Sequence, residues 1–297
     1  MPWGTPLCER NRVRVKPERD FRNAGELDPR HAGEDPRNSP FRERAVEIDL
    51  RRCAFVRPAA ALWCLIYPLL AKRRGADCTL FVPTDAGASE YLKSLGLFDL
   101  LQKAGVQVDT RGIRDRLAPQ LVLPLTRFDR QDEVERIANE VLDRLSSSGL
   151  GAANLYPLVS EVFAELALNA VEHSESAIGS FGFVQFYEFR EGQRFVCGVA
   201  DGGIGIRASL EKNPTLRSRV PYDWTAIELA VRERVTGTGD KTRGIGLYGI
   251  SEDMRKPARQ LILHSGIGSL MINEEMETAA RRTTLFPGTL AYASIPT

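Results

Sequence analysis

The sequence predicts an α+β fold: a two-layer α/β sandwich with a mixed sheet, preceded by a small α/β domain. Three observations lead to this prediction. Residues 1–44 mix charged residues with Pro and Asn without an apolar period, which is typical of a disordered or loosely ordered tail. Strand-like and helix-like segments alternate over residues 45–118, and strands are grouped after helices over residues 119–297. The length allows two domains, each with its own core.

The first domain is predicted from short apolar runs that alternate with longer helical segments. "AVEIDL" (residues 45–50) and "CTLFVP" (residues 78–83) indicate strands. Residues 57–76 lie between them and indicate an apolar helix, and residues 86–105 indicate one further helix or two short ones. This alternation is typical of an α/β unit.

The second domain is predicted from helices and strands in separate groups. A strand at residues 121–128 precedes an amphipathic helix at 132–150 that ends in Ser and Gly, and an apolar helix at 161–176 follows. The remaining elements are a hairpin of 181–189 with 194–201, a helix at 223–234, and strands at 260–265, 269–273 and 289–295. We therefore expect helices on one face of a sheet.

Bulk composition excludes several classes of protein. Forty basic and thirty-nine acidic residues give a net charge of +1, which disfavours binding to nucleic acid. Five cysteines without CxxC spacing disfavour a disulfide framework or a zinc site and suit the reducing cytoplasm. No run reaches the roughly 18 apolar residues of a membrane span, and the first residues carry no apolar signal core. We expect a cytoplasmic protein that does not enter the membrane.

The helix at residues 161–176 carries a polar stripe on an otherwise apolar cylinder. Glu165, Asn169, Glu172 and His173 follow one another at steps of three or four, or directly, and share one face. Such a stripe either faces solvent or lines a pocket, and its position alone does not decide between the two. A structural role for His173 near the helix end is at least as well supported as a functional one.

Three further segments combine glycines with polar residues. "VADGGIGI" places Asp201 at a strand end, before Gly203 and Gly205, and "PGTLAYASIP" places Thr289 at the start of the last strand. "TGTGDKTRGIGLYGI" is a Gly-rich loop that leads into a helix at Leu247; its other notable residues are Lys241, Arg243, Gly244 and Gly246. Each segment alone is a weak signal, because glycine often serves only in turns.

Two common phosphate-binding motifs can be weighed against these glycines. A dinucleotide fingerprint must lie between a strand and its helix in a βαβ unit, and neither the glycines after Asp201 nor those around Gly246 have that context. A P-loop needs lysine directly after glycine, and Asp240 separates Lys241 from the preceding glycine. Both readings are disfavoured.

Taken in order, the four segments resemble the Bergerat ATP-binding fold of histidine kinase-like ATPases, which includes gyrase B, the mismatch-repair ATPases and the anti-sigma serine kinases. Glu165 and Asn169 match the N-box; Asp201 and its glycines, Gly244 with Gly246, and Gly288 with Thr289 match the later boxes. The resemblance covers residues 119–297, and "NAVEHS" is most similar to the anti-sigma branch. Residues 45–110 resemble a STAS domain, without a phosphorylatable hydroxyl in the turn at 56–62.

The resemblance implies ATP and Mg²⁺ as cofactors and assigns roles to single residues. It implies that Asn169 is a ligand of Mg²⁺, that Glu165 is the catalytic base and that Asp201 accepts a hydrogen bond from the adenine amino group. Backbone approach to the base is implied at Gly203 and Gly205. The implied cofactor-binding set is completed by Lys241, Arg243, Gly244, Gly246, Leu247 and Thr289, the first four of which face the phosphates.

The implied function is an ATP-binding regulatory protein, with slow Mg²⁺-dependent ATPase activity that works as an ATP-gated protein-interaction switch. A Ser/Thr protein kinase of the anti-sigma type is the alternative, and a nucleotide-binding module without hydrolysis is a second alternative. The expected partner is a regulatory protein, STAS-like or related to sigma factors, and a homodimer stays open. Residues 207–243 are expected to form a lid that nucleotide orders. None of the three histidines lies on dimerisation helices, which disfavours a histidine kinase.

Overall fold

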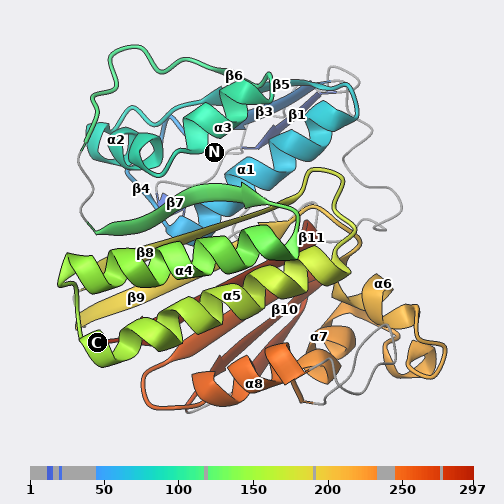
Figure 1. Cartoon of the computed structure of the whole chain (residues 1–297). Helices are drawn as coiled ribbons and strands as arrows, with labels where there is room; N and C mark the ends of the chain where they lie inside the picture. Colours follow the sequence, from blue (N-terminus) through green and yellow to red (C-terminus); the bar gives the residue numbers. More distant parts are fainter. Residues whose placement is uncertain are drawn as a thin grey trace, which may run out of the picture.

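The described chain has a mixed α+β architecture with a four-stranded parallel sheet, a five-stranded antiparallel sheet and a two-stranded parallel pair (Figure 1). The computed structural model describes residues 12–15, 20–21, 45–116, 120–189, 192–232, 245–274 and 277–297. Over these residues, no helix is long and apolar enough to cross a membrane. The expected boundary at residues 118–119 lies outside the described part of the chain.

The parallel sheet occupies the N-terminal part of the chain. Its strands, in spatial order, are β1 (Arg12–Val15), β3 (Ala45–Asp49), β5 (Asp77–Phe81) and β6 (Gln107–Val108). Parallel neighbours need a crossover, which is supplied by α1 (Pro58–Arg73) and then by α2 (Ala86–Ser94) with α3 (Leu97–Lys103). The segment at 86–105 therefore forms two short helices, separated at Gly96, whose φ is 84°.

Two strands fall within the segment that was expected to be a tail. β1 extends the edge of the parallel sheet beside β3, and β2 (Asp20–Phe21) pairs in parallel with β4 (Phe55–Val56). The expectation was wrong for these residues, because a neighbouring strand edge can order a short segment that has no apolar period of its own. The rest of residues 1–44 lies outside the described part of the chain.

The apolar helix α1 lies between the two sheets, which explains why it is apolar on every side. One face packs on the parallel sheet and the other on the back face of the antiparallel sheet, so that a single hydrophobic cluster spans both. Gly198 allows the close approach, since a Cβ there would lie 3.0 Å from Leu62 Cδ1 of α1. The two sheets thus share a core, where separate cores were expected.

The second sheet is antiparallel throughout its described strands, which corrects the expected mixed sheet. Its strands, in spatial order, are β10 (Gln260–Asn273), β11 (Glu277–Pro296), β9 (Gly192–Asp201), β8 (Ser180–Phe189) and β7 (Leu121–Phe128). In the chain, β7 and β8 are separated by two helices of equal length, α4 (Gln131–Ser148) and α5 (Tyr156–His173). These two helices pack against each other. The pair returns the chain to the end where β7 finished, so β8 must run in the opposite direction.

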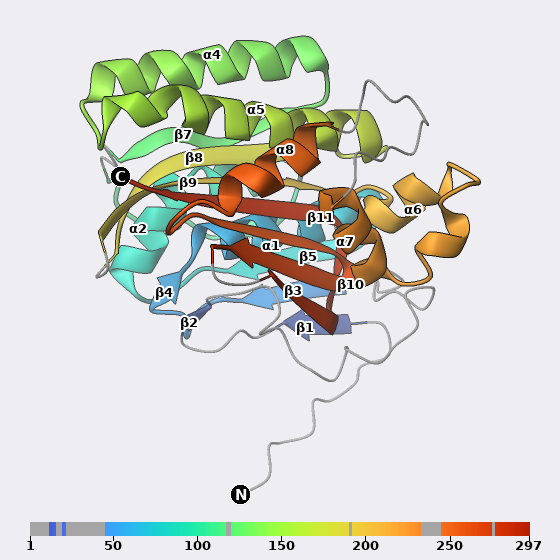
Figure 2. The same cartoon turned by 90° about the horizontal axis from the view of Figure 1, so that it is seen from below.

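Side chains of β9 alternate between two covered faces. Phe195, Cys197 and Val199 belong to the core beneath α4 and α5, whereas Val196 and Ala200 belong to the core around α1. Figure 2 shows the resulting order of layers: the two long helices, the antiparallel sheet, α1 and the parallel sheet. The expected two-layer sandwich is therefore covered on its second face as well.

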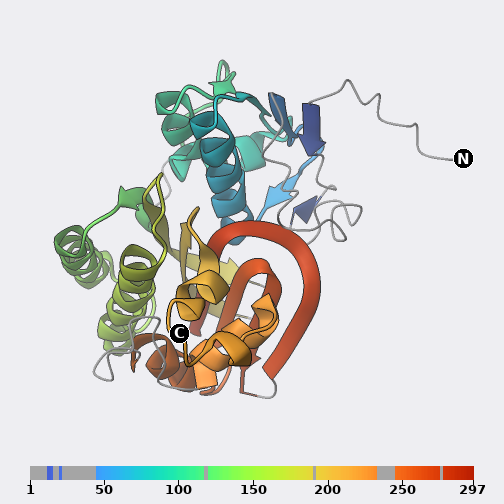
Figure 3. The ribbon, with the colours of Figure 1, turned by 90° about the vertical axis from the view of Figure 1, so that its right-hand side faces the viewer.

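The last two strands are longer than expected. Residues 260–273 form one strand with register shifts between Ser265 and Gly268, and β11 bends strongly beside it (Figure 3). Between β9 and β10, the chain forms α6 (Gly205–Glu211), α7 (Asp223–Arg232) and α8 (Ile245–Met254). Short 3-10 turns occur at Ala153–Leu155 and Arg217–Arg219. The helix α6 was not anticipated, and residues 233–244 lie outside the described part of the chain.

A candidate ligand pocket between α5, α6 and the antiparallel sheet

One pocket brings together residues from most elements of the C-terminal part of the chain. Val199, Leu263 and Ala291 line it from the helix-facing side of the sheet, and Leu166 of α5 and Ile206 of α6 also line it. Asn169, His173, Asp201 and Thr289 are the most polar residues of its lining. The pocket is therefore an apolar slot with a small number of polar groups, which is the usual composition of a small-molecule site.

Asp201 is the one acid among the described residues that line this pocket, and 2% of its surface is exposed. The register pairs Ala200 with Leu290, so Asp201 and Thr289 come next on the helix-facing side of β9 and β11. The Asp201 carboxylate accepts hydrogen bonds from the backbone N–H of Gly203 at 2.8 Å and of Thr289 at 3.3 Å. Burial raises the pKa of Asp201 to about 7, and the two N–H donors oppose that shift.

Close backbone packing around Asp201 requires glycine at two positions. Gly288 has a φ of 100°, and a Cβ there would lie 2.7 Å from Asp201 Oδ1. A Cβ at Gly203 would collide with the carbonyl of Ser174, which accepts a hydrogen bond of 2.8 Å from Ile204 N. Gly203 therefore packs the loop against the end of α5, and it is Gly205 that lines the pocket.

The polar stripe of α5 divides among three environments. Asn169 and His173 line the pocket, while Glu172 accepts a hydrogen bond from Gln131 of α4 and serves helix packing. Glu165 is half-buried next to Asn169, whose Nδ2 donates to the Glu165 carbonyl at 2.7 Å. Burial, followed by the nearby charges of Glu161 and Glu172, raises the pKa of Glu165.

The first turn of α8 lies over Glu165 and Asn169. A Cβ at Gly246 would meet Glu165 Oε2 and would lie 3.3 Å from Asn169 Nδ2. Leu247, one residue further, lines the pocket. The sequence-predicted residues Glu165, Asn169, Asp201, Gly205, Gly246, Leu247 and Thr289 are thus gathered at one place. The predicted phosphate-facing residues Lys241, Arg243 and Gly244 lie outside the described residues.

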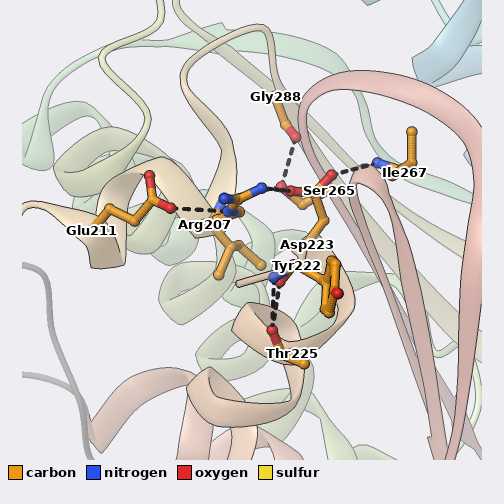
Figure 4. A network of polar contacts seen from close by, with 9 residues as sticks. Arg207, Glu211, Tyr222, Asp223, Thr225, Ser265, Ile267 and Gly288 are labelled. Atoms are coloured by element: carbon orange, nitrogen blue, oxygen red, sulfur yellow. Dashed lines mark hydrogen bonds and ion pairs between the residues drawn. The ribbon is translucent and has the colours of Figure 1, made fainter. Parts of the chain in front are cut away.

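The part of β10 at which its register with β11 shifts holds the two helices that follow Asp201 (Figure 4). Ser265 Oγ accepts a hydrogen bond of 2.9 Å from Ile206 N of α6, and Ile267 N donates to Asp223 Oδ2 of α7 at 2.9 Å. Arg207 pairs with Glu211 at 2.9 Å and lies 4.0 Å from Asp223. These contacts hold α6 and α7, which together we call the pocket cover, at the edge of the sheet.

Sequence reasoning missed Ser265 and the residues that α6 contributes. Ile206, Ser209 and Leu210 line the pocket, and the spacing of four between Ile206 and Leu210 was a helical signal. Ser265 carries no comparable local signal, because a serine in an apolar strand is equally compatible with solvent exposure. Only the register between β10 and β11 places it opposite Thr289.

The donor set limits how a metal could be held. Among the described residues, no group of three or more His, Cys, Asp or Glu could hold a metal ion. A cation at this site would therefore need oxygens from a bound ligand as well as Asn169. Comparison of the chain with models of protein families and with curated protein sequences gives no match.

Proposed function

We propose that the chain is an ATP-binding regulatory protein whose nucleotide site is this pocket. The observation that carries the proposal is that residues from four separate segments surround one apolar slot: Asn169 of α5, Asp201 of β9, Leu247 of α8 and Thr289 of β11. These are the segments on which the resemblance to the Bergerat ATP-binding fold rests. The antiparallel sheet with α4 and α5 on one face is compatible with that fold.

The deep end of the slot suits adenine. The apolar side chains of its lining would contact a flat ring, and the buried carboxylate of Asp201 would accept a hydrogen bond from the amino group. Guanine presents a carbonyl at the equivalent position, which would leave the carboxylate unpaired. An unpaired buried polar group costs about 1–3 kcal/mol, so ATP should bind well above GTP.

The end of the slot near α8 suits the phosphates. Nδ2 of Asn169 is used in the bond to the Glu165 carbonyl, so the amide oxygen is the atom left for a hard cation. Mg²⁺, when bound, would neutralise phosphate charge, and Asn169 is the residue that would hold it. The start of α8 at Gly246 adds the backbone N–H groups of a helix N-terminus, which favour anions.

Glu165 is the residue best placed to act as a base. Its raised pKa makes it a stronger proton acceptor than an ordinary glutamate, and its contact with the start of α8 places it near the phosphate end. It would orient an attacking water and hold its proton during slow hydrolysis of ATP. ATP binding would favour one position of the pocket cover, and ATP hydrolysis would favour the other. We propose that this change of position is the switch.

The partner of the switch would be a separate regulatory protein. The N-terminal unit, which we propose to be STAS-like, is docked through α1 on the sheet face opposite the pocket. It is therefore not placed to receive a phosphoryl group from ATP in the pocket of the same chain. The helix α1 also begins without a side-chain cap at Arg57, in agreement with the lack of a phosphorylatable hydroxyl in that turn.

Incubation of the purified chain with γ-labelled ATP and Mg²⁺, with and without cell lysate as a source of partner proteins, tests the proposal, with EDTA and labelled GTP as controls. Slow release of free phosphate is expected, with Mg²⁺ required and GTP ineffective. Label on a protein partner would instead identify a Ser/Thr kinase. Binding in calorimetry without either product would identify a nucleotide-binding module, and absence of ATP binding would refute the nucleotide site itself.

A further inference from the structure

Ser265 is a buried residue that no sequence motif includes, and only 3% of its surface is exposed. It lies on β10 where the register with β11 shifts, directly opposite Thr289 on β11. Its side chain does not line the pocket, whereas Thr289 does. Any effect of Ser265 on a ligand must therefore pass through the residues that its hydroxyl contacts.

The hydroxyl of Ser265 is saturated by three partners. It accepts a hydrogen bond from Ile206 N at 2.9 Å, it lies 2.9 Å from the carbonyl oxygen of Gly288, and it lies 3.3 Å from the hydroxyl of Thr289. A serine hydroxyl has one proton and two lone pairs. A carbonyl oxygen can only accept, so the single proton of Ser265 is committed to Gly288.

This commitment decides the direction of the contact with Thr289. Because Ser265 has no second proton, the Thr289 hydroxyl must be the donor of the bond between them. Thr289 then keeps only lone pairs for the pocket. Asp201, next to Thr289, is also an acceptor when ionised, and its Oδ1 already receives the Thr289 backbone N–H.

We propose that Ser265 is a specificity-determining residue, because it fixes Thr289 as a hydrogen-bond acceptor and so selects ligands that present an amino group beside Asp201. An amino group carries two N–H donors, one for each acceptor. A carbonyl at the same place has no proton, so both acceptors would face its lone pairs. The inference rests on the proposed nucleotide site and deepens it: Asp201 and Ser265 together select a 6-amino purine over a 6-oxo purine.

Removal of the Ser265 hydroxyl should relax this choice. In Ser265→Ala, the Thr289 hydroxyl loses its acceptor and becomes free to rotate and donate into the pocket. A ligand carbonyl would then find a donor at this edge, whereas the carboxylate of Asp201 would still favour an amino group. The preference for a ligand amino group over a carbonyl should therefore become smaller, but it should not disappear.

Calorimetric titration with ADP and IDP tests the proposal, since these nucleotides differ only by an amino group or a carbonyl oxygen on the ring and the accompanying ring proton. Measurement at pH 8 keeps Asp201 mostly ionised, because its pKa is about 7. The wild-type chain should prefer ADP, and Ser265→Ala should reduce the ratio of the two affinities by about tenfold, the value of one hydrogen bond. Ser265→Thr, which keeps a hydroxyl, should restore the ratio.

Two further variants make the result specific. Ser160→Ala removes another buried serine hydroxyl, bonded to the Ala138 carbonyl at 2.8 Å, and should leave the ADP/IDP ratio unchanged. Thr289→Val removes the hydroxyl acceptor itself and keeps the shape of the side chain. It should reduce the ADP/IDP affinity ratio even if Ser265→Ala folds poorly.

Four outcomes would overturn the proposal. An equal loss of ADP and IDP affinity in Ser265→Ala would show a merely structural role. An ADP/IDP affinity ratio in Thr289→Val equal to that of the wild-type chain would show that the Thr289 hydroxyl does not contact the amino or carbonyl group of the ligand. A wild-type chain that binds neither nucleotide would refute the proposed function and this inference together, whereas tight ADP binding with an unchanged ratio in every variant would refute only the inference.

Discussion

Asp201 accepts a hydrogen bond from the backbone N–H of Thr289 across 3.3 Å, although the two residues are 88 positions apart in the chain. The pairing of β9 with β11 creates this contact at the deep end of the pocket. A carboxylate that is buried there must either stay protonated or receive donors from the protein and from a ligand. Most of the expected behaviour of the pocket follows from this relationship.

Asp201 should make the stability of the chain depend on pH. Its pKa is about 7 when folded and about 4 in an unfolded chain, so between these values the folded state binds more protons. The contribution to stability is complete below about pH 4 and is lost as the pH rises through 7. We expect the free energy of unfolding to fall over this window, by up to about 4 kcal/mol.

Asp201→Asn isolates this effect, because asparagine does not titrate and its oxygen can still accept from Gly203 and Thr289. Urea unfolding at pH 5, 6, 7 and 8 should show that the free energy of unfolding of the variant increases relative to that of the wild-type chain as the pH rises. Parallel pH profiles for the two proteins would contradict the prediction. The variant should also bind ATP more weakly.

Substitutions of Glu165 and Asn169 should have separable effects. Glu165→Ala removes a base that binding does not need, so ATP affinity should hold while turnover falls by roughly 10²–10⁴-fold. Asn169→Ala removes the proposed metal ligand, so Mg²⁺-dependent affinity and turnover should fall together. Titration and turnover assays are paired with a melting scan of the ligand-free variants.

The exposed Glu161, one turn before Glu165, supplies the control for this pair. Glu161→Ala should leave ATP affinity unchanged and should alter turnover by only a small factor, because the Glu161 charge is a lesser cause of the raised pKa of Glu165 than burial. Loss of ATP binding in Glu165→Ala with intact binding in Asn169→Ala would reverse the two roles. Loss of thermal stability in both variants without a selective effect on ATP would make them structural residues only.

Gly288→Ala should destabilise the chain. The φ of 100° is strained for alanine, and the new Cβ would press on the Asp201 backbone and carboxylate. The strain alone costs about 1–3 kcal/mol, and nucleotide affinity should fall as well because Asp201 must move. Urea unfolding and an ATP titration measure the two effects.

Gly249→Ala is the matched control, since Gly249 lies inside α8 with no atom within 4 Å of an added Cβ. It should stabilise the chain by about 0.5–1 kcal/mol through helix propensity. An unchanged unfolding free energy in Gly288→Ala would show that β11 adapts at this position without strain.

Leu62→Ala should weaken both sheets at once. Leu62 is fully buried in α1, within the core that the parallel and antiparallel sheets share. Truncation of a buried leucine costs about 2–5 kcal/mol. We expect differential scanning calorimetry to show one cooperative transition that moves to lower temperature, as it should for Leu145→Ala in the core beneath α4. A transition that splits into two would show that the sheets fold independently.

Much of the candidate site could be predicted from the sequence, because its signals are local. The spacing of Glu165 and Asn169 places both on one helix face, and Asp201 ends a strand whose alternation can be read residue by residue. The glycines around Asp201 mark places where backbone packs against backbone. These properties depend on neighbours a few positions away.

Other features depended on partners far along the chain. The apolar character of α1 indicated burial, but only the assembled structure shows that two sheets cover it. The direction of β8 follows from the paired return of α4 and α5, and α6 was hidden in a polar segment. The role of Ser265 arises solely from the register of β10 against β11.

The sequence by itself determined which residues could carry the chemistry of this protein, because helix spacing, strand alternation and glycine backbone freedom are properties of short segments. The tertiary structure alone decided which of them meet. Asp201, Thr289 and Ser265 become neighbours only through the pairing of three strands, and a register shift of one residue would turn these side chains to the opposite face.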